Sequence, residues 1–278
     1  SDWYIEYSGT SMATPVAAGA SIIVREYLMD IVERPAPQGS LIKALLILGA
    51  QDMGARDIPN NDEGWGRLDL VNSLIPQNDI GIFVDDRSRL SSGQESDYSF
   101  EITRPNEELK IVLTWSDYPG SSFSSTQLMN DLDLEVTSPD GQTTYLGNVF
   151  SNGKSVTGGI KDSKNNVEVV LIDSASEGIW NVNVKDSSHG GNRIYQPYSI
   201  AVRGVNVNDL TPDPAIISDS FTISVPVPQV DEQVDFSISI SNQGTGFSSN
   251  VPISAYFNSN LVDTKFIDLN PGETTTLE

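Results

Sequence analysis

The pattern of apolar residues changes near residue 78, and this change limits what the chain can fold into. Before it, residues 41–50 form a short stretch that is too apolar to be anything but a buried helix. After it, apolar and polar residues alternate with a period of two, as in residues 109–115 and 179–184, which is typical of strands. Turn sequences separate these strands. We therefore expect a helical segment followed by antiparallel β-sandwiches.

Composition narrows the range of partners. The 278 residues are enough for about two domains. They include 38 Asp and Glu against 16 Lys and Arg, a formal net charge of −22. This negative charge argues against nucleic acid and anionic membranes as binding partners, because both would repel the chain. Cysteine is absent, which excludes a disulfide framework, and no apolar stretch approaches the roughly twenty residues of a membrane span.

A serine near the start of the chain is a candidate nucleophile. Residues 9–15 read Gly-Thr-Ser-Met-Ala-Thr-Pro, and the small residues 16–20 suit a helix that packs closely on its neighbours. We expect Thr14 and Pro15 to lie in the first turn of this helix. Ser11 would then lie at the helix N-terminus, where free N–H groups and the helix dipole favour negative charge. A nucleophile whose reaction builds an oxyanion belongs at such a position.

The heptad resembles the nucleophile motif of the subtilisin-like serine proteases, the subtilases. The resemblance implies that Ser11 attacks the scissile carbonyl and that its own backbone N–H forms part of the oxyanion hole. It further implies that Gly9, Thr10 and Met12 support the nucleophile. Residues 64–69, Gly-Trp-Gly-Arg-Leu-Asp, also match the end of subtilase catalytic domains. We therefore expect residues 1–78 to be the C-terminal part of an α/β subtilase catalytic domain.

The catalytic partners of Ser11 are lacking in this sequence. Subtilases place Asp and His before Ser in chain order. The single histidine, His189, instead lies far downstream in a Ser-Ser-His-Gly-Gly stretch that indicates a solvated loop. The sequence also has no start methionine or signal sequence. We therefore expect a fragment of a secreted serine endopeptidase that forms an acyl-enzyme at Ser11 in the parent and is inactive by itself.

The region after the helices resembles the jelly-roll domain of the KP-43-like alkaline subtilases. The resemblance covers residues 79–205 and rests on residues 113–120, 130–134 with 138–141, and 165–168. Asp131 and Asp133 share one face of a strand and could converge on a hard cation. The resemblance implies a structural calcium ion that the chemistry does not require. Candidates for further oxygen ligands are Asp140, Asn148, Asp162 and Asn165. The alternative is that the acidic pair caps a strand and faces water.

A second boundary follows at residues 206–214, which are polar and contain prolines, as linkers do. Residues 206–278 resemble a CARDB-type immunoglobulin-like sandwich, which we expect to be truncated, with a strand and turn over residues 234–246.

Two functions are consistent with this organisation. The first is a subtilisin-type endopeptidase acting on protein or peptide substrates outside the cell. The second is a non-catalytic secreted binding or spacer protein whose β-domains hold a surface or polymer, with the protease motif as a remnant. We also expect the apolar helices of residues 1–75 to be exposed and molten while the jelly roll folds, because the resemblance implies that their core is incomplete.

Overall fold

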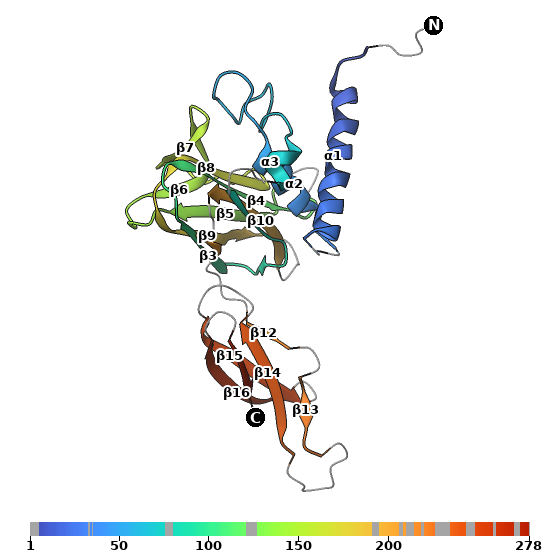
Figure 1. Cartoon of the computed structure of the whole chain (residues 1–278), viewed down its shortest axis with the longest axis vertical. Coiled ribbons are helices and arrows are strands. Elements are labelled where there is room, and N and C mark those ends of the chain that lie inside the picture. Colours follow the sequence, from blue (N-terminus) through green and yellow to red (C-terminus); the bar gives the residue numbers. More distant parts are fainter. Residues whose placement is uncertain are drawn as a thin grey trace. The chain divides into compact units, whose positions relative to one another are not determined.

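The computed structural model describes residues 6–32, 34, 36–75, 80–120, 127–190, 195–205, 208–209, 214–217, 220–225, 234–242, 248–257, 260–269 and 273–277. The chain divides into two compact units, residues 1–207 and 208–278. Strands predominate in both units, and the helices of the described residues lie in the first (Figure 1). The expected mostly-β organisation after a helical segment is confirmed.

Three helices precede the strands of the first unit: α1 (Thr10–Asp30), α2 (Gly39–Gly49) and α3 (Leu70–Leu74). Asp69 caps the N-terminus of α3, because its carboxylate accepts the Asn72 N–H at 3.1 Å. The α1 helix already begins at Thr10, so Pro15 lies in its second turn rather than in the first as expected. Since proline has no N–H, the carbonyl of Ser11 has no helical donor from that position.

Two antiparallel sheets follow the helices. The first has the strand order β1-β10-β4-β8, with β2 paired to β10. Its strands are β1 (Ile80–Asp85), β2 (Arg89–Leu90), β4 (Glu107–Trp115), β8 (Val167–Ala175) and β10 (Gln196–Val205). The second includes the order β3-β9-β5-β6-β7. These strands are β3 (Glu95–Ile102), β5 (Asn130–Thr137), β6 (Thr144–Ser151), β7 (Lys154–Thr157) and β9 (Gly178–His189).

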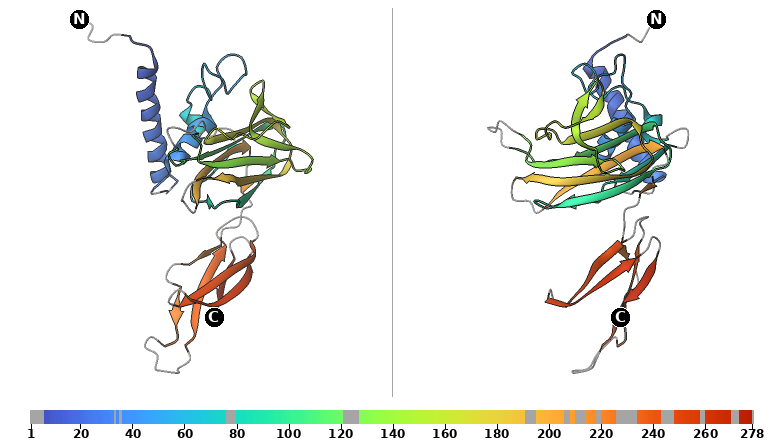
Figure 2. Two further views of the ribbon diagram at one scale, coloured as in Figure 1. Left: turned by 180° about the vertical axis from the view of Figure 1, so that it is seen from behind. Right: turned by 90° about the vertical axis from the view of Figure 1, so that its left-hand side faces the viewer.

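In the first unit, whose helices and strands Figure 2 shows from two further sides, apolar residues pack on both faces of the first sheet. Between the sheets lies the main core, to which β4 contributes Leu109, Ile111, Leu113 and Trp115. On the other face, Val112, Val169 and Ala201 pack against the α2 helix in a second cluster. The order of layers is therefore helices, first sheet, second sheet. Because both faces of the first sheet are covered, its strands β4, β8 and β10 are buried along most of their length.

Polar groups connect the α2 helix to the first sheet. Buried Lys110 donates from Nζ to the Ile47 carbonyl at 2.7 Å, and Thr114 Oγ1 donates to the Ser40 carbonyl, also at 2.7 Å. The hydroxyls of Ser40 and Ser199 lie 2.7 Å apart. The expectation that all the apolar helices are exposed is therefore wrong for α2, because the sandwich covers it. The α1 helix does expose apolar residues, including Val16 and Ile22.

The second unit contains only strands among its described residues. They are β11 (Asn208–Asp209), β12 (Pro214–Ile216), β13 (Thr222–Ile223), β14 (Phe236–Asn242), β15 (Ser248–Phe257), β16 (Asn260–Leu269) and β17 (Thr274–Leu277). Within it β14 pairs with β12, β13 and β17, while β15 pairs with β16. The turn expected after residue 242 and most of the linker expected at 206–214 lie outside the described residues.

Candidate active-site serine and carboxylate cluster

Ser11 is the second residue of the α1 helix and is exposed. Gly9 precedes the helix with φ 140°, in the region that favours glycine, and its carbonyl accepts the N–H groups of Met12 at 3.0 Å and Ala13 at 3.1 Å. The Thr14 hydroxyl donates to the Thr10 carbonyl at 2.8 Å. Since the first N–H groups of a helix lack partners within it, this end of α1 favours an anion.

His189 is not the solvated loop residue that the sequence predicts. Its side chain is only 5% exposed, and its Nδ1 lies 2.6 Å from Oδ2 of the fully buried Asp186 side chain. His189 pairs with Asn130 of β5 and is the last residue of β9. A strand end therefore stands where the sequence predicts a loop. This strand belongs to the second sheet, whereas the helix of Ser11 packs in the layer outside the first sheet. His189 therefore does not stand beside Ser11 as a base.

Three acidic residues of the first unit lie close together where β5 and β8 approach each other. Asp131 and Asp133 come from β5, and Glu168 comes from β8 in the other sheet. Glu168 Oε2 accepts the Leu134 N–H of β5 at 2.6 Å, which links the two strands. Asp133 and Glu168 are each 1% exposed. Asp131, Asp133 and Glu168 each have one buried oxygen without a hydrogen-bond partner, namely Oδ1, Oδ1 and Oε1.

The protonation of these carboxyls reflects their crowding. Burial raises the pKa of Glu168 to about 9, and the charges of Asp133, Asp162 and Asp131 add to this effect. Burial, with the charge of Asp133 next, raises the pKa of Asp131 to about 6. Buried acceptors without donors and mutually repelling carboxylates are what a hard cation would stabilise. These residues therefore fit the calcium ion that the resemblance implies.

A lysine and an amide-rich loop border this cluster. Lys161 Nζ lies 2.8 Å from Asp133 Oδ2 and 2.6 Å from Glu135 Oε1. Asp162 Oδ2 accepts the side-chain amides of Asn148 and Asn165, each at 2.6 Å. Although burial acts to raise it, these bonds hold the pKa of Asp162 below its usual value. The structure thus brings together Asn148, Asp162 and Asn165 through bonds of the two amides to Asp162. Their role as oxygen ligands of a cation stays a prediction.

Asp140 does not join them. It lies in the turn after the far end of β5, where its Oδ1 accepts the Ser138 hydroxyl at 2.5 Å and the Gln142 N–H at 3.0 Å. At about 3.4 Å per strand residue, Asp131 near the start of β5 is too far away to share a cation with it. The expectation that Asp140 is a ligand together with Asp131 and Asp133 is therefore wrong, because Asp140 lies at the other end of β5 and its carboxylate bonds within the turn.

Glu168 and Lys161 are site residues that are not among those expected from the sequence. Glu168 begins the otherwise apolar run Val169-Val170-Leu171-Ile172 inside a buried strand, and a carboxylate at such a position was a usable signal. Lys161 gives no comparable signal, because it lies in a polar connection between β7 and β8. Its proximity to Asp133 depends on how that connection passes over β5.

A second acidic group lies in the loop before α3. Carboxylate oxygens of Asp52, Asp57 and Glu63 all lie within 4.8 Å of one another. Asp52 Oδ2 accepts the Asp57 N–H at 3.2 Å, and Glu63 Oε2 accepts the Met53 N–H at 2.9 Å. These bonds close the loop on itself, and the group is at least partly exposed. Asp52 Oδ1 is buried without a hydrogen-bond partner, but no residue of the group is buried as a whole.

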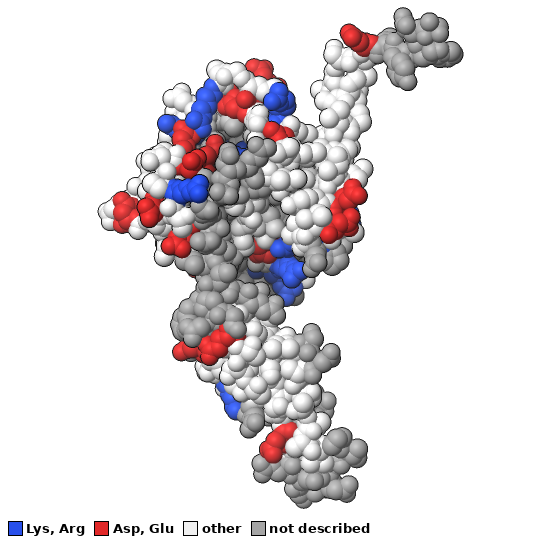
Figure 3. Space-filling model, in the orientation of Figure 1, with Lys and Arg blue, Asp and Glu red and all other residues white. Residues whose placement is uncertain are grey.

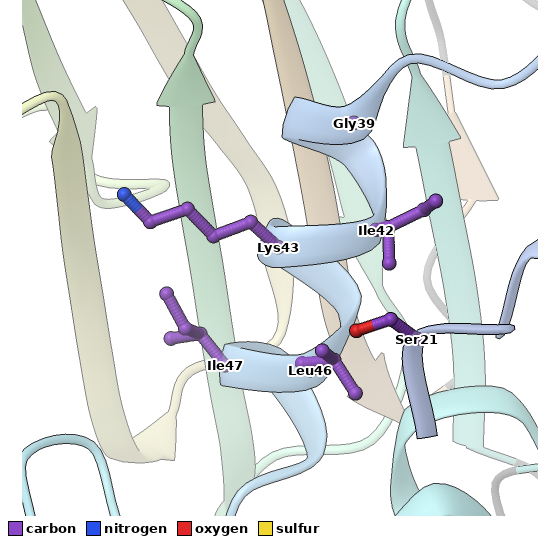
Figure 4. Close-up of a pocket in the computed structure, with 6 residues that line it drawn as sticks. All are labelled: Ser21, Gly39, Ile42, Lys43, Leu46 and Ile47. Atoms are coloured by element: carbon purple, nitrogen blue, oxygen red, sulfur yellow. The ribbon is translucent and has the colours of Figure 1, made fainter. Parts of the chain in front are cut away.

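An apolar hollow of about 570 Å³ lies between α1 and α2. Figure 4 shows the residues that line it, which are Ser21, Gly39, Ile42, Lys43, Leu46 and Ile47. Burial lowers the pKa of Lys43, whose Nζ donates to Asn166 Oδ1 at 3.0 Å. On the face seen in Figure 3, acidic side chains are interspersed with lysines and arginines.

Two family models match separate parts of the chain. Residues 1–66 match the model of the subtilase family, and residues 123–199 match that of the proprotein convertase P-domain. Three curated relatives come from Dictyostelium discoideum and are named serine protease/ABC transporter B family proteins. They are tagD, 29% identical over 222 residues, tagA, 29% over 219, and tagB, 31% over 225. The matches cover 59%, 72% and 59% of this chain, respectively.

The chain spans only 12% of the length of each relative. Among the described residues, no helix is both long and apolar enough to cross a membrane.

Proposed function

This chain fits part of a subtilase, and we propose that Ser11 is the nucleophile of a serine endopeptidase in the complete protein. Its Oγ would attack the scissile carbonyl and form an acyl-enzyme. The observation that carries this proposal is the position of Ser11 at the exposed N-terminus of α1, after a glycine with positive φ. The helix N-terminus would stabilise the developing oxyanion, and the Ser11 N–H would contribute to the oxyanion hole.

The general base belongs to another part of the complete protein, since His189 is paired with Asp186 in the second sheet. The 278-residue chain by itself is therefore inactive. We infer protein or peptide substrates and an extracellular location from the family. We further propose that residues 79–205 are a jelly roll and residues 206–278 an immunoglobulin-like sandwich.

A fluorophosphonate probe tests the nucleophile. The complete protease should be labelled, and Ser11→Ala should abolish both labelling and proteolysis. Ser8→Ala, a matched change three residues earlier, should leave both intact. Strong labelling of the 278-residue chain alone would show that the base lies within it. If the complete protein is not labelled, the non-catalytic binding or spacer function is favoured instead.

We also propose that the first unit binds a structural calcium ion through Asp131, Asp133 and Glu168. The support is that each of these residues has a buried carboxylate oxygen without a partner. Calcium should raise the melting midpoint of the chain relative to chelator. Asp133→Asn should remove this response, whereas Asp140→Asn should retain it. A midpoint that is the same in calcium and in chelator would contradict the proposal.

A further inference from the structure

Lys161 occupies one side of the carboxylate cluster. Its ammonium contacts Asp133, whose side chain is 2% exposed, and also Glu135, whose side chain is 32% exposed. The Ser187 hydroxyl donates to the same Asp133 oxygen, Oδ2, that Lys161 contacts. Asp133 Oδ1 remains without a partner. The lysine thus neutralises the outer side of the cluster and leaves the inner oxygens unpaired.

One ammonium is too little charge for this cluster. Asp131, Asp133 and Glu168 would together carry three negative charges when ionised, and Asp162 and Asp186 add two more nearby. Burial makes each uncompensated charge costly. A divalent ion among the unpaired oxygens would supply the missing positive charge, but it would also repel the nearby ammonium.

The lysine has room to move away from Asp133. Its side chain is 40% exposed, and it comes from a connection in which Gly158 and Gly159 have φ values of 79° and 84°. Glu135 is more exposed than Asp133 and already contacts the ammonium at 2.6 Å. The ammonium can therefore leave Asp133 without losing its second carboxylate partner.

We propose that Lys161 is a built-in competitor of the cation: it neutralises Asp133 in the cation-free protein, and calcium bound by Asp131, Asp133 and Glu168 displaces it toward Glu135. This inference rests on the calcium site proposed above. It makes Lys161 the residue that sets calcium affinity. It also makes the ion a connection between β5 and β8, which belong to opposite sheets.

Calorimetric titration of the 278-residue chain with Ca²⁺ at fixed ionic strength tests this competition. Lys161→Met should tighten calcium binding about tenfold, because it removes a like charge next to the ion. Lys164→Met makes the same change of charge three residues along the connection. Since only the backbone N–H of Lys164 contacts Asp162, this control should stay within about twofold of the wild type.

Two further variants test the charge at position 161 and the carboxylate ligand at position 168 separately. Lys161→Arg keeps the charge and should bind calcium as the wild type does. Glu168→Gln keeps an acceptor for the Leu134 N–H but should lose calcium binding. Melting in chelator establishes that each variant is folded.

The outcomes distinguish the two proposals. If the wild type binds calcium and Lys161→Met binds it equally or more weakly, the competition is overturned while the calcium site stands. If only Lys161→Met binds, the competition is supported. If no variant binds calcium, both proposals are overturned.

Discussion

At the residue scale, the packing of α2 on the first sheet buries a lysine of β4, Lys110. In an isolated sheet this side chain would face water, but here it is 2% exposed and donates to the Ile47 carbonyl near the end of α2. A cation at that end of a helix interacts favourably with the helix dipole. Burial, followed by the charge of Arg203, nevertheless lowers the pKa of Lys110 to about 8. Folding therefore makes this lysine a weaker base.

This shift predicts how stability depends on pH. Because the folded pKa lies below the unfolded value of 10.5, the unfolded state binds the proton more tightly between about pH 8 and 10.5. The contribution of Lys110 to the free energy of unfolding should therefore rise by about 3 kcal/mol as the pH increases through that window. Below pH 8 Lys110 is protonated in both states, and the full free-energy cost of burying its charge remains. Urea unfolding at several pH values should show this rise in the wild type and in Lys164→Met, but not in Lys110→Met. If the free energy of unfolding depends on pH in the same way in the wild type and in Lys110→Met, the prediction is wrong.

At the scale of elements, the close approach of α2 and α3 depends on Gly49. A Cβ placed on Gly49 would lie 2.2 Å from Ser73 Oγ and 2.3 Å from Ser73 N, and the latter is backbone that cannot rotate away. Ser73 is fully buried, and its hydroxyl donates to the Asp69 carbonyl at 2.8 Å. The two helices therefore pack at this distance only because position 49 has no side chain.

Gly49→Ala should consequently destabilise the first unit by about 2 kcal/mol, a typical cost of overpacking. Gly39→Ala is the matched control in the same helix, since a Cβ there meets nothing within 4 Å. The control should be neutral or slightly stabilising, because alanine favours helix more than glycine does. Chemical denaturation of both variants measures the difference. Equal stability of the two would show that α3 moves away without cost.

At the scale of the whole molecule, the helices and the sandwich share a core within the first unit. Leu41, Leu45 and Leu48 of α2 are buried in the same cluster as Val112 and Val169 of the sheet. Removing either layer would expose the apolar face of the other. The two layers should therefore unfold together, and the second unit should unfold by its own equilibrium.

Leu48→Ala tests this cooperativity. The substitution should cost about 2–5 kcal/mol and lower the melting temperature of the sandwich, although Leu48 lies in the helical segment. Near-ultraviolet circular dichroism follows the sandwich through Trp115 and Trp180, which are buried between its sheets. Ile22→Ala, at a position 67% exposed on α1, should change little. A sandwich transition unaffected by Leu48→Ala would mean that the two layers fold separately.

Local patterns were enough to predict part of this organisation. Apolar density predicted the α2 helix, and alternation predicted β4 and β9, because these signals arise from neighbouring residues. The Ser-Ser-His-Gly-Gly stretch predicted a loop, but its residues through His189 belong to β9, because pairing with β5 outweighed their turn composition. The grouping of Asp131 with Asp133 followed from strand geometry, whereas Glu168 comes from a different sheet, so its approach to them depends on tertiary structure.

The sequence by itself determined the subtilase motif around Ser11 and the change from helix to strand near residue 78. Tertiary structure alone decided that the sandwich covers α2, that Lys110 is buried and that His189 pairs with Asp186. It also decided that Lys161 lies on Asp133. The physical reason is that burial and long-range contacts depend on which faces meet, whereas composition and periodicity record only which faces are available.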